Sequence, residues 1–555
     1  METYEHKAAG DQIRVEKVEN PYLRGSDDLS PSEKNKLFIK MMQTIDSIPV
    51  PLDLELSAGD VIALAGDYYT LPGWGKQLQL PPRHRNVVAE NEQLFHEPVL
   101  PGENAAFHSA YSDLASPSVK KRDVDRIYAI EKRTYIPFFS SLNSLIQQLV
   151  YSWTVKDYGK KLNENEAHFA PWSARAYIVG HHTALQNAQL AFYCEQLANG
   201  SIRETDEQIP QALRDALQKS RLNPATFKLQ EQIKDNKTLY NELMHRYHAL
   251  AIGQDLFAMH FYSDHYAGGH ISRIGRLRQS MPEQFGVWGS ILINNMHNED
   301  NSDGVTVTDP FQPERHAPYT SEDKPFRMIR EDNVAYGDGT YLQRDNAENS
   351  NMLINGMDNS LGDIYLARTT GEIRRSQDYG GLAFLPEIDY SKRQTQPLLI
   401  QGQDGTVYVR SNLSQIRMLS PTEYQRTLQN PQDNDYEKLT YWGAFKLVFK
   451  LRVLGFIYSP KIMAISPERE QEIQQDEQRF EHHTTSKSLR PASREHAAMD
   501  LPHLDQVGAW RMNPLASKSG AGLFDHRIAA FEEAVTQLGA EHGIGERETT
   551  TFNFT

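Results

Sequence analysis

Cysteine is almost absent from the sequence, and its absence limits both covalent cross-linking and metal chemistry. The single Cys194 excludes an intramolecular disulfide and a cysteine-rich zinc site. Any metal ion must therefore be held by His, Asp and Glu side chains. That ligand set is typical of catalytic rather than structural zinc.

Long apolar runs are also missing. The chain has no stretch of about 18 apolar residues, so we expect no transmembrane helix. Its first residues, METYEHKAAGDQIRVEKVEN, lack the apolar core of a Sec-type signal peptide. We therefore expect synthesis in a cytoplasm without a Sec signal.

An excess of positive charge is missing as well. The chain has 58 Lys and Arg against 73 Asp and Glu, for a formal net charge of −15. Sequence-independent nucleic-acid binding depends on neutralising phosphates with Lys and Arg, so we expect no nucleic-acid partner. The sequence also has no Walker loop, dinucleotide-binding fingerprint or nucleophile elbow.

The chain has 555 residues, more than one hydrophobic core usually supports. We expect a mainly α protein: a helical catalytic domain with a smaller C-terminal α+β region. The predicted segments are a flexible N-terminal lead-in over 1–55, a catalytic domain over 56–370, an α+β region over 371–465, and a polar segment over 466–555. That last segment is expected to be flexible over 466–525 and then to contain a short helix and a polar tail.

Helical periodicity of apolar residues dominates residues 120–300, and a later helix is expected near 346–368. The piece PLLIQGQDGTVYVR, residues 397–410, predicts a β-hairpin, because Asp404–Gly405 is a turn signal between two apolar runs. The sequence shows no internal repeats.

The richest local pattern is GQDLFAMHFYSDHYAGGH, residues 253–270. His260 and Asp264 are four apart, so on a helix they project from one face and can bind the same ion. Gly268–Gly269 would let the backbone turn and bring His270 to a neighbouring ion. With 20 His and 73 acidic residues in the chain, this spacing also arises by chance. The alternative is a helix whose His and Asp are hydrogen-bonded surface groups.

The spacing His-x3-Asp-x5-His resembles the central motif of the zinc phospholipase C and P1-type nuclease superfamily. The wider string resembles a group of secreted or injected bacterial phospholipases C. Other pieces resemble that group in the same order, over roughly residues 56–370: AGDYY (65–69), AHFAPW (167–172), NNMHNEDN (294–301), GDGTYL (337–342) and NSLGDIYLA (359–367).

This resemblance implies two or three zinc ions and a phospholipid substrate at a membrane surface, cleaved to diacylglycerol and a phosphorylated head group. One ion would be held by Asp67, His168, His260 and Asp264, with Asp67 and Asp264 among the catalytic carboxylates and Asp264 able to bridge to a neighbouring ion.

A second ion would be held by His270 and His297 with Glu299 or Asp300. The superfamily has a Glu four residues after its last His, whereas this chain has Asn301. One of the two neighbouring carboxylates must therefore substitute, or the ion is held differently.

Several other residues carry two interpretations. Asp255 is interpreted as a catalytic-site acid that orients a metal-bound imidazole. Arg273 and Arg276 are candidates for binding the lipid phosphate, or are solvated surface groups. His181 and His182 are expected to have a core or supporting role more than direct metal ligation. His108 and His245 are treated as structural.

Two functions remain beside the phospholipase. A P1-type nuclease would use the same metals on a nucleic-acid diester, and a non-catalytic binding module would use metal only for stability. Head-group preference and oligomeric state are not encoded in any pattern of the sequence.

Two further segments bear on membranes and export. Residues 442–458, WGAFKLVFKLRVLGFIY, fit either a membrane surface or, as favoured here, a buried element with lysines reaching to solvent. The acidic, Thr-rich tail over 536–555 resembles signals on effectors injected by type IV secretion, so export or injection into a host cell is expected, with an ordinary terminus as the alternative.

Overall fold

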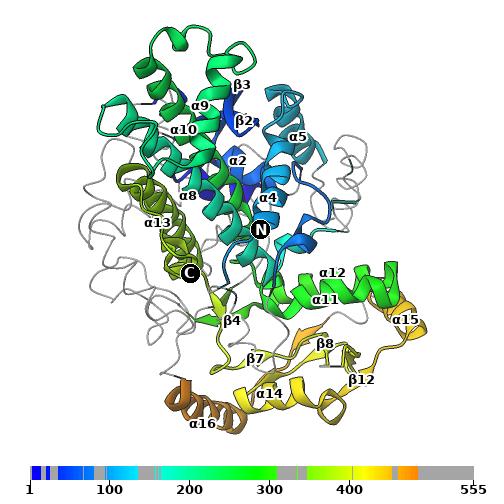
Figure 1. Cartoon of the computed structure of the whole chain (residues 1–555). Coiled ribbons are helices and arrows are strands. Elements are labelled where there is room, and N and C mark those ends of the chain that lie inside the picture. Colours follow the sequence, from blue (N-terminus) through cyan, green and yellow to red (C-terminus); the bar gives the residue numbers. More distant parts are fainter. Residues whose placement is uncertain are drawn as a thin grey trace, which may run out of the picture.

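The computed structural model describes residues 3–13, 20–25, 36–66, 68–80, 94, 97–134, 157, 160–161, 164–308, 334–335, 347–402, 404–452 and 460–484. Within these residues the protein is mainly helical, as predicted (Figure 1). The α-helices are α1 (Thr3–Gly10), α2 (Ala58–Ala65), α4 (Pro101–Leu114), α5 (Lys121–Thr134), α8 (Trp172–Ala198), α9 (Gln211–Leu222), α10 (Asn236–Asp264), α11 (Ser272–Phe285), α12 (Val287–Asp303), α13 (Ala347–Thr370), α14 (Pro421–Gln429), α15 (Tyr441–Arg452) and α16 (Pro467–Thr484).

The strands are short apart from one hairpin near the N-terminus. They are β1 (Leu23–Arg24), β2 (Phe38–Ile45), β3 (Ile48–Ser57), β4 (Val305–Thr308), β5 (Val334–Ala335), β6 (Glu387–Ile388), β7 (Gln394–Thr395), β8 (Leu399–Gln401), β9 (Val407–Arg410), β10 (Gln415–Ile416), β11 (Met418–Leu419), β12 (Tyr436–Lys438) and β13 (Lys461–Ile462). Three sheets have three strands each, in the orders β1-β2-β3, β12-β9-β8 and β5-β4-β6.

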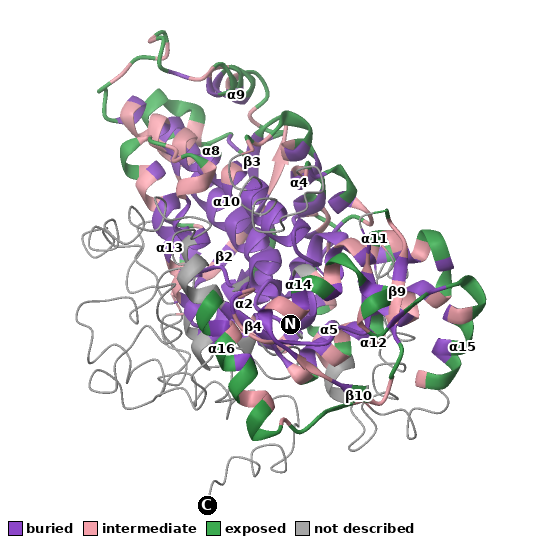
Figure 2. Ribbon diagram, turned by 90° about the horizontal axis from the view of Figure 1, so that it is seen from below, coloured by how far each residue is buried: buried purple, intermediate pink, exposed green. Residues whose placement is uncertain are grey.

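The helices α8 and α10 form the centre of the molecule. They run antiparallel, because Ser173 near the start of α8 bonds His265 just after α10, while Asn187 further along α8 bonds Gln254. From Ala249 to Asp264 every residue of α10 is buried (Figure 2). A helix that is buried on all sides belongs to the core, which explains its weak amphipathic pattern.

The N-terminal residues belong to this core. The strands β2 and β3 form an antiparallel hairpin whose two turn residues, Asp46 and Ser47, both have positive φ. Helix α1 crosses α2 so closely that a Cβ on Gly10 would lie 2.6 Å from Gly59 Cα. The prediction of a flexible lead-in over 1–55 is therefore wrong for its described residues.

The helix expected near 346–368 is confirmed as α13, which packs against both α8 and α10. The short 3-10 helix η7 (Gly380–Phe384) follows and lies against α13. Two tyrosines of α10 hold this segment, because Tyr262 donates to Gly381 O at 2.6 Å and Tyr266 donates to Phe384 O at 2.7 Å.

A second core joins α11 and α12 to the C-terminal α+β region. Ile274, Leu292 and Met296 pack there with residues of β8, β9 and α15. The predicted hairpin over 397–410 is confirmed: β8 pairs antiparallel with β9, and the turn residue Gly405 has a φ of 81°.

Helix α16 lies inside the segment 466–525 that was expected to be flexible, so that expectation is wrong for residues 467–484. Ion pairs fix it in place: Arg393 bonds both Glu470 and Glu477. The expected short helix over 526–538 and the tail over 536–555 lie outside the described residues. No helix in the described part of the chain has the length and apolar character needed to span a bilayer.

Candidate metal centre

Asp264, the last residue of α10, is the centre of a buried cluster of imidazoles. Its Oδ1 lies 3.3 Å from His6 Nε2 and 3.4 Å from His270 Nδ1. Its Oδ2 lies 2.6 Å from His168 Nδ1 and 3.4 Å from His260 Nε2. Four imidazoles therefore converge on a single carboxylate, two at each oxygen.

Several elements of the fold bring these side chains together. His260 and Asp264 share a face of α10 because they are one helical turn apart. His168 ends the short helix η2 (Glu166–His168) before α8, and the antiparallel packing of α8 and α10 brings it beside Asp264. His270 ends η4 (Gly268–His270), as the Gly-Gly spacing predicted.

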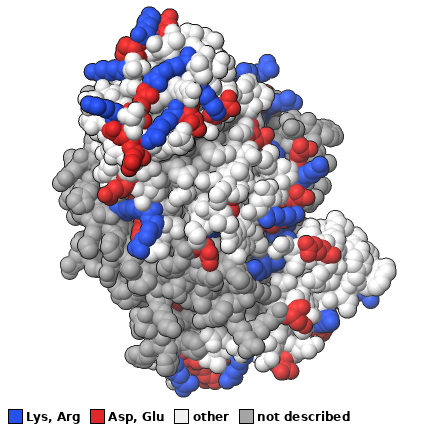
Figure 3. All heavy atoms as spheres, viewed as in Figure 1, with Lys and Arg blue, Asp and Glu red and all other residues white. Residues whose placement is uncertain are grey.

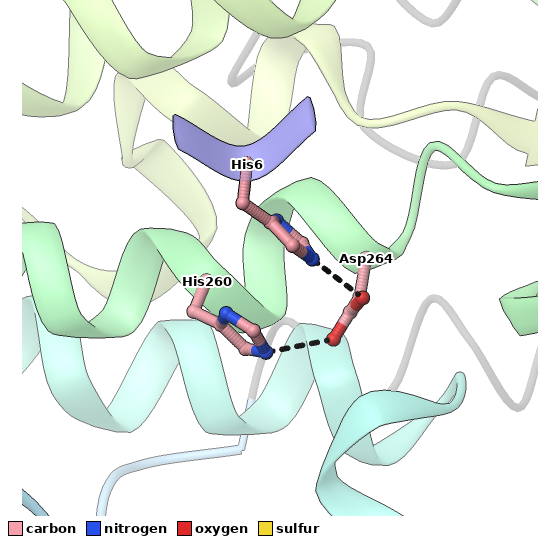
Figure 4. Close-up of side chains that lie close together, drawn as sticks. All are labelled: His6, His260 and Asp264. Carbon is pink, nitrogen blue, oxygen red and sulfur yellow. Dashed lines mark ion pairs between the residues drawn. The ribbon is translucent and has the colours of Figure 1, made fainter. Parts of the chain in front are cut away.

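His6 belongs to the cluster although no sequence pattern predicted it as a candidate ligand. It lies on α1, and its ring stacks on that of His260 with centroids 4.3 Å apart. In Figure 4 the Nε2 atoms of both rings point toward the Asp264 carboxylate. His6, His260 and Asp264 offer ligand atoms within 4.8 Å of one another, so this buried group could hold a metal ion.

Hydrogen bonds set the tautomers of these two rings. The Ser263 hydroxyl donates to His260 O at 2.8 Å, so its oxygen accepts from His6 Nδ1, also at 2.8 Å. His260 Nδ1 in turn donates to Ile62 O at 2.7 Å. Both Nε2 atoms therefore keep a lone pair, and the buried His6 Nε2 forms no hydrogen bond. Such partners on the far ring nitrogen are typical of metal-binding histidines.

The protonation states of His260 and Asp264 also favour metal binding. Burial, together with the neighbouring His6, lowers the pKa of the His260 imidazole well below its usual value. Burial acts to raise the pKa of the Asp264 carboxyl, but electrostatic interactions with the groups around it, His270 among them, hold that pKa well below its usual range. A neutral imidazole and an ionised carboxylate are the forms that bind metal.

The absence of a side chain at Gly66 leaves room for the rings of His260 and His168. A Cβ at this position would lie 1.9 Å from His260 Nε2 and 2.4 Å from His168 Cε1. The residue follows α2 with an ordinary φ of −92°, so glycine is needed here for space and not for backbone conformation. Asp67, the next residue and a predicted ligand, lies outside the described residues.

The second predicted ion site is only partly assembled by the described residues. The rings of His270 and His297 lie 5.0 Å apart. The Asn301 amide donates to His297 Nε2 at 3.3 Å and accepts from Gly269 N at 2.6 Å. This residue therefore ties α12 to the Gly-Gly turn.

The two carboxylates predicted to complete that site are engaged by arginines. Glu299 receives two hydrogen bonds from the buried Arg410, at 2.7 and 3.0 Å. Asp300 lies 3.2 Å from Arg273. Burial raises the pKa of the Asp300 carboxyl to about 7, although Arg273 acts to lower it.

Arg273 is therefore held by Asp300 and by Thr395 Oγ1, at 3.0 Å. Its neighbour Arg276 lies over the Trp172 ring, 5.9 Å from the centroid. Both side chains therefore have partners within the protein, and the buried Arg273 is not a solvated surface group.

Asp255 belongs to a separate buried network next to the cluster. It accepts from His181 Nδ1 at 2.7 Å, and Ser360 Oγ donates to it at 3.0 Å. On the other side, His181 Nε2 lies 3.4 Å from Asp363. Burial acts to lower the pKa of His181, but the two carboxylates raise it to about 9. Asp255 thus orients an imidazole, and that imidazole is His181.

Comparison with known proteins adds no relative: no family model, curated protein or solved structure matches the chain.

Proposed function

We propose that the protein is a zinc-dependent phosphodiester hydrolase of the phospholipase C type, which releases diacylglycerol and a phosphorylated head group. The observation that carries the proposal is the convergence of His6, His168 and His260 on the buried Asp264. Nitrogen and carboxylate donors without sulfur are typical of catalytic zinc sites. The choice of a lipid diester follows the resemblance of residues 253–270 to bacterial phospholipases C.

Two features of the cluster support a bound zinc ion. It contains a buried nitrogen without a hydrogen bond, His6 Nε2, and an ionised carboxylate with two oxygens turned toward different histidines. Burying an ionised carboxylate is costly, and a bound cation would offset that cost. When bound, zinc would polarise a phosphodiester oxygen and lower the pKa of a coordinated water.

Different residues of the cluster would hold the two ions. His6, His168 and His260 would hold one ion together with the Asp264 carboxylate, and the same carboxylate also faces His270. His270 and His297 would provide nitrogen for a second ion. Because Arg410 and Arg273 engage Glu299 and Asp300, Asp264 is the described carboxylate that supplies charge to both positions.

Burial also indicates the side from which substrate arrives. His6, His260 and Asp264 are inaccessible, His168 and His270 are slightly exposed, and His297 is half-buried. The lipid phosphate therefore approaches past His297. The hydrogen bond between His181 of α8 and Asp255 of α10 holds these two helices together.

The test is metal analysis of the purified protein paired with an assay on a panel of phospholipids and on single-stranded DNA. We expect bound zinc and release of diacylglycerol. His260→Ala and Asp264→Asn should lose both, whereas the matched control His182→Ala, a half-buried histidine outside the cluster, should keep both.

Each other outcome has a definite meaning. Free fatty acid among the products would show that a different bond is cut. Strong DNA cleavage without lipid turnover would favour a nuclease. Tightly bound zinc without any hydrolysis would favour a metal-stabilised binding module.

A further inference from the structure

Helix α15 presents an aromatic face to solvent. Tyr441, Trp442, Phe445 and Phe449 are all exposed, and the Trp442 side chain is 71% accessible. The opposite face is apolar as well, but it is buried in the second core, where Ala444, Leu447 and Val448 lie. A helix anchored on one apolar side has no structural need for aromatic residues on the other.

The aromatic face continues onto the first turn of α12. Phe445 packs edge-on against Trp288, with ring centroids 5.1 Å apart, and the preceding Val287 is exposed. We call Val287, Tyr441, Trp442, Phe445 and Phe449 the aromatic patch. It lies on a lobe at the edge of the molecule, seen at the right of Figure 1. In Figure 3 this lobe is mostly uncharged, whereas the upper end of the molecule carries many charges of both signs.

The charged residues of α15 itself are all positive. Lys446 and Lys450 are exposed on the same side of α15, each directly after an exposed phenylalanine. The sequence of α15, YWGAFKLVFKLR, contains no acidic residue, although the whole chain has a net charge of −15. A positively charged helix on an acidic protein would be drawn to an anionic surface.

We propose that the aromatic patch binds the surface of anionic phospholipid membranes. Tryptophan, tyrosine and phenylalanine insert at the boundary between head groups and acyl chains, and flanking lysines contact anionic head groups. A second copy of the chain fits less well, because a two-fold contact would set the lysines of one helix against those of the other. The expectation of a buried element over 442–458 holds for one face of α15, whereas Trp442, Phe445 and Phe449 are exposed.

The position of the patch connects it to the metal centre. Val287 begins α12 and His297 lies ten residues later on the same helix, about 15 Å along its axis. A protein docked through α15 would therefore hold the centre close to the lipid surface. That this surface is also the substrate rests on the proposed function, whereas binding to it does not.

The experiment measures cosedimentation of the full chain with vesicles of phosphatidylcholine, alone or mixed with phosphatidylglycerol, on ice. The test variant is Trp442→Ser with Phe449→Ser. The matched control is Leu222→Ser, because Leu222 on α9 is 69% accessible and lies outside the patch. Circular dichroism confirms that each variant is folded.

We expect the wild type and the control to bind the mixed vesicles more tightly than the neutral ones. The double variant should bind at least about tenfold more weakly, since burying each large apolar side chain is worth a factor of roughly ten. Lys446→Gln should reduce only the preference for anionic vesicles. Turnover of a monomeric short-chain phosphatidylcholine should be the same in all variants.

Two results would overturn the proposal: unchanged vesicle binding by the folded double variant, or no binding by the wild type. Dimers that dissociate on Trp442→Ser would also overturn it, by assigning the patch to self-association. Failure of the proposed function is a separate outcome, because it would abolish turnover of the monomeric lipid and leave vesicle binding intact.

Discussion

Replacing Gly66 by alanine should destroy the metal centre without touching any ligand. The new Cβ would lie 1.9 Å from His260 Nε2 and 2.4 Å from His168 Cε1. Ordinary contacts need about 3.5 Å, so the rings must retreat by roughly 1.5 Å. Metal–ligand distances tolerate only about 0.2 Å. Overpacking of this kind also costs about 1–3 kcal/mol of folding stability.

The assay compares Gly66→Ala with Gly102→Ala. Gly102, near the start of α4, has open space around its added Cβ, so its variant should be neutral or slightly more stable. Zinc content and zinc affinity by chelator competition are measured for both variants, with thermal unfolding before and after chelation. We expect Gly66→Ala to lose zinc and to show no further change on chelation. Full zinc content with wild-type affinity in this variant would refute the geometry of the cluster.

Three further predictions follow from the buried groups. Ser263→Ala should weaken zinc binding by roughly tenfold to a hundredfold, because Ser263 orients His6, and His6→Ala should weaken it more. Zinc affinities of both variants equal to that of the wild type, measured by competition titration, would show that His6 is not part of the site. The pKa of the His181 imidazolium is raised to about 9, so its contribution of roughly 3 kcal/mol to the free energy of unfolding should be complete below pH 6.5 and lost as the pH rises through 9. Urea unfolding of metal-free protein should show this loss of stability. The same dependence of stability on pH in His181→Asn as in the wild type would contradict it. Cys194→Ser should lose about 1–3 kcal/mol of folding stability, because the buried thiol lies among apolar residues, yet it should retain zinc and activity. Loss of turnover in the folded variant would assign the thiol a role in the site.

The sequence reveals the ligands that are close together in it. His260 and Asp264 are visible because the helical period places them on one face. His6 is not visible, because the contact that brings it to Ser263 spans 257 positions. The small residues Gly10 and Gly59 allow α1 to cross α2, but single glycines indicate close packing only once the partner helix is known.

Two prolines, Pro49 and Pro51, lie within β3, and because proline usually interrupts a strand the local sequence does not predict this hairpin. Pro51 of β3 pairs with Met42 next to an irregularity in the register between Lys40 and Met42. Proline is tolerated in a strand at such a position. Only the pairing partner shows that this segment is a strand.

The ion pairs of charged segments are likewise not predictable from the local sequence. Helix α16 is mostly polar, a composition that favours a flexible segment, yet Ile473 is buried and Arg393 and Thr422 from outside the helix bond its acidic residues. Likewise, nothing near Glu299 in the sequence reveals that Arg410 occupies its carboxylate. Long-range ion pairs of this kind follow from the fold and leave no local pattern.

Chelation followed by zinc return tests the central claim most directly. The products formed from phosphatidylcholine are analysed by mass spectrometry for the protein as purified, after chelation, and after zinc is restored. The account predicts diacylglycerol and phosphocholine from the first and third samples and neither from the second. Undiminished diacylglycerol release by demonstrably metal-free protein would contradict it.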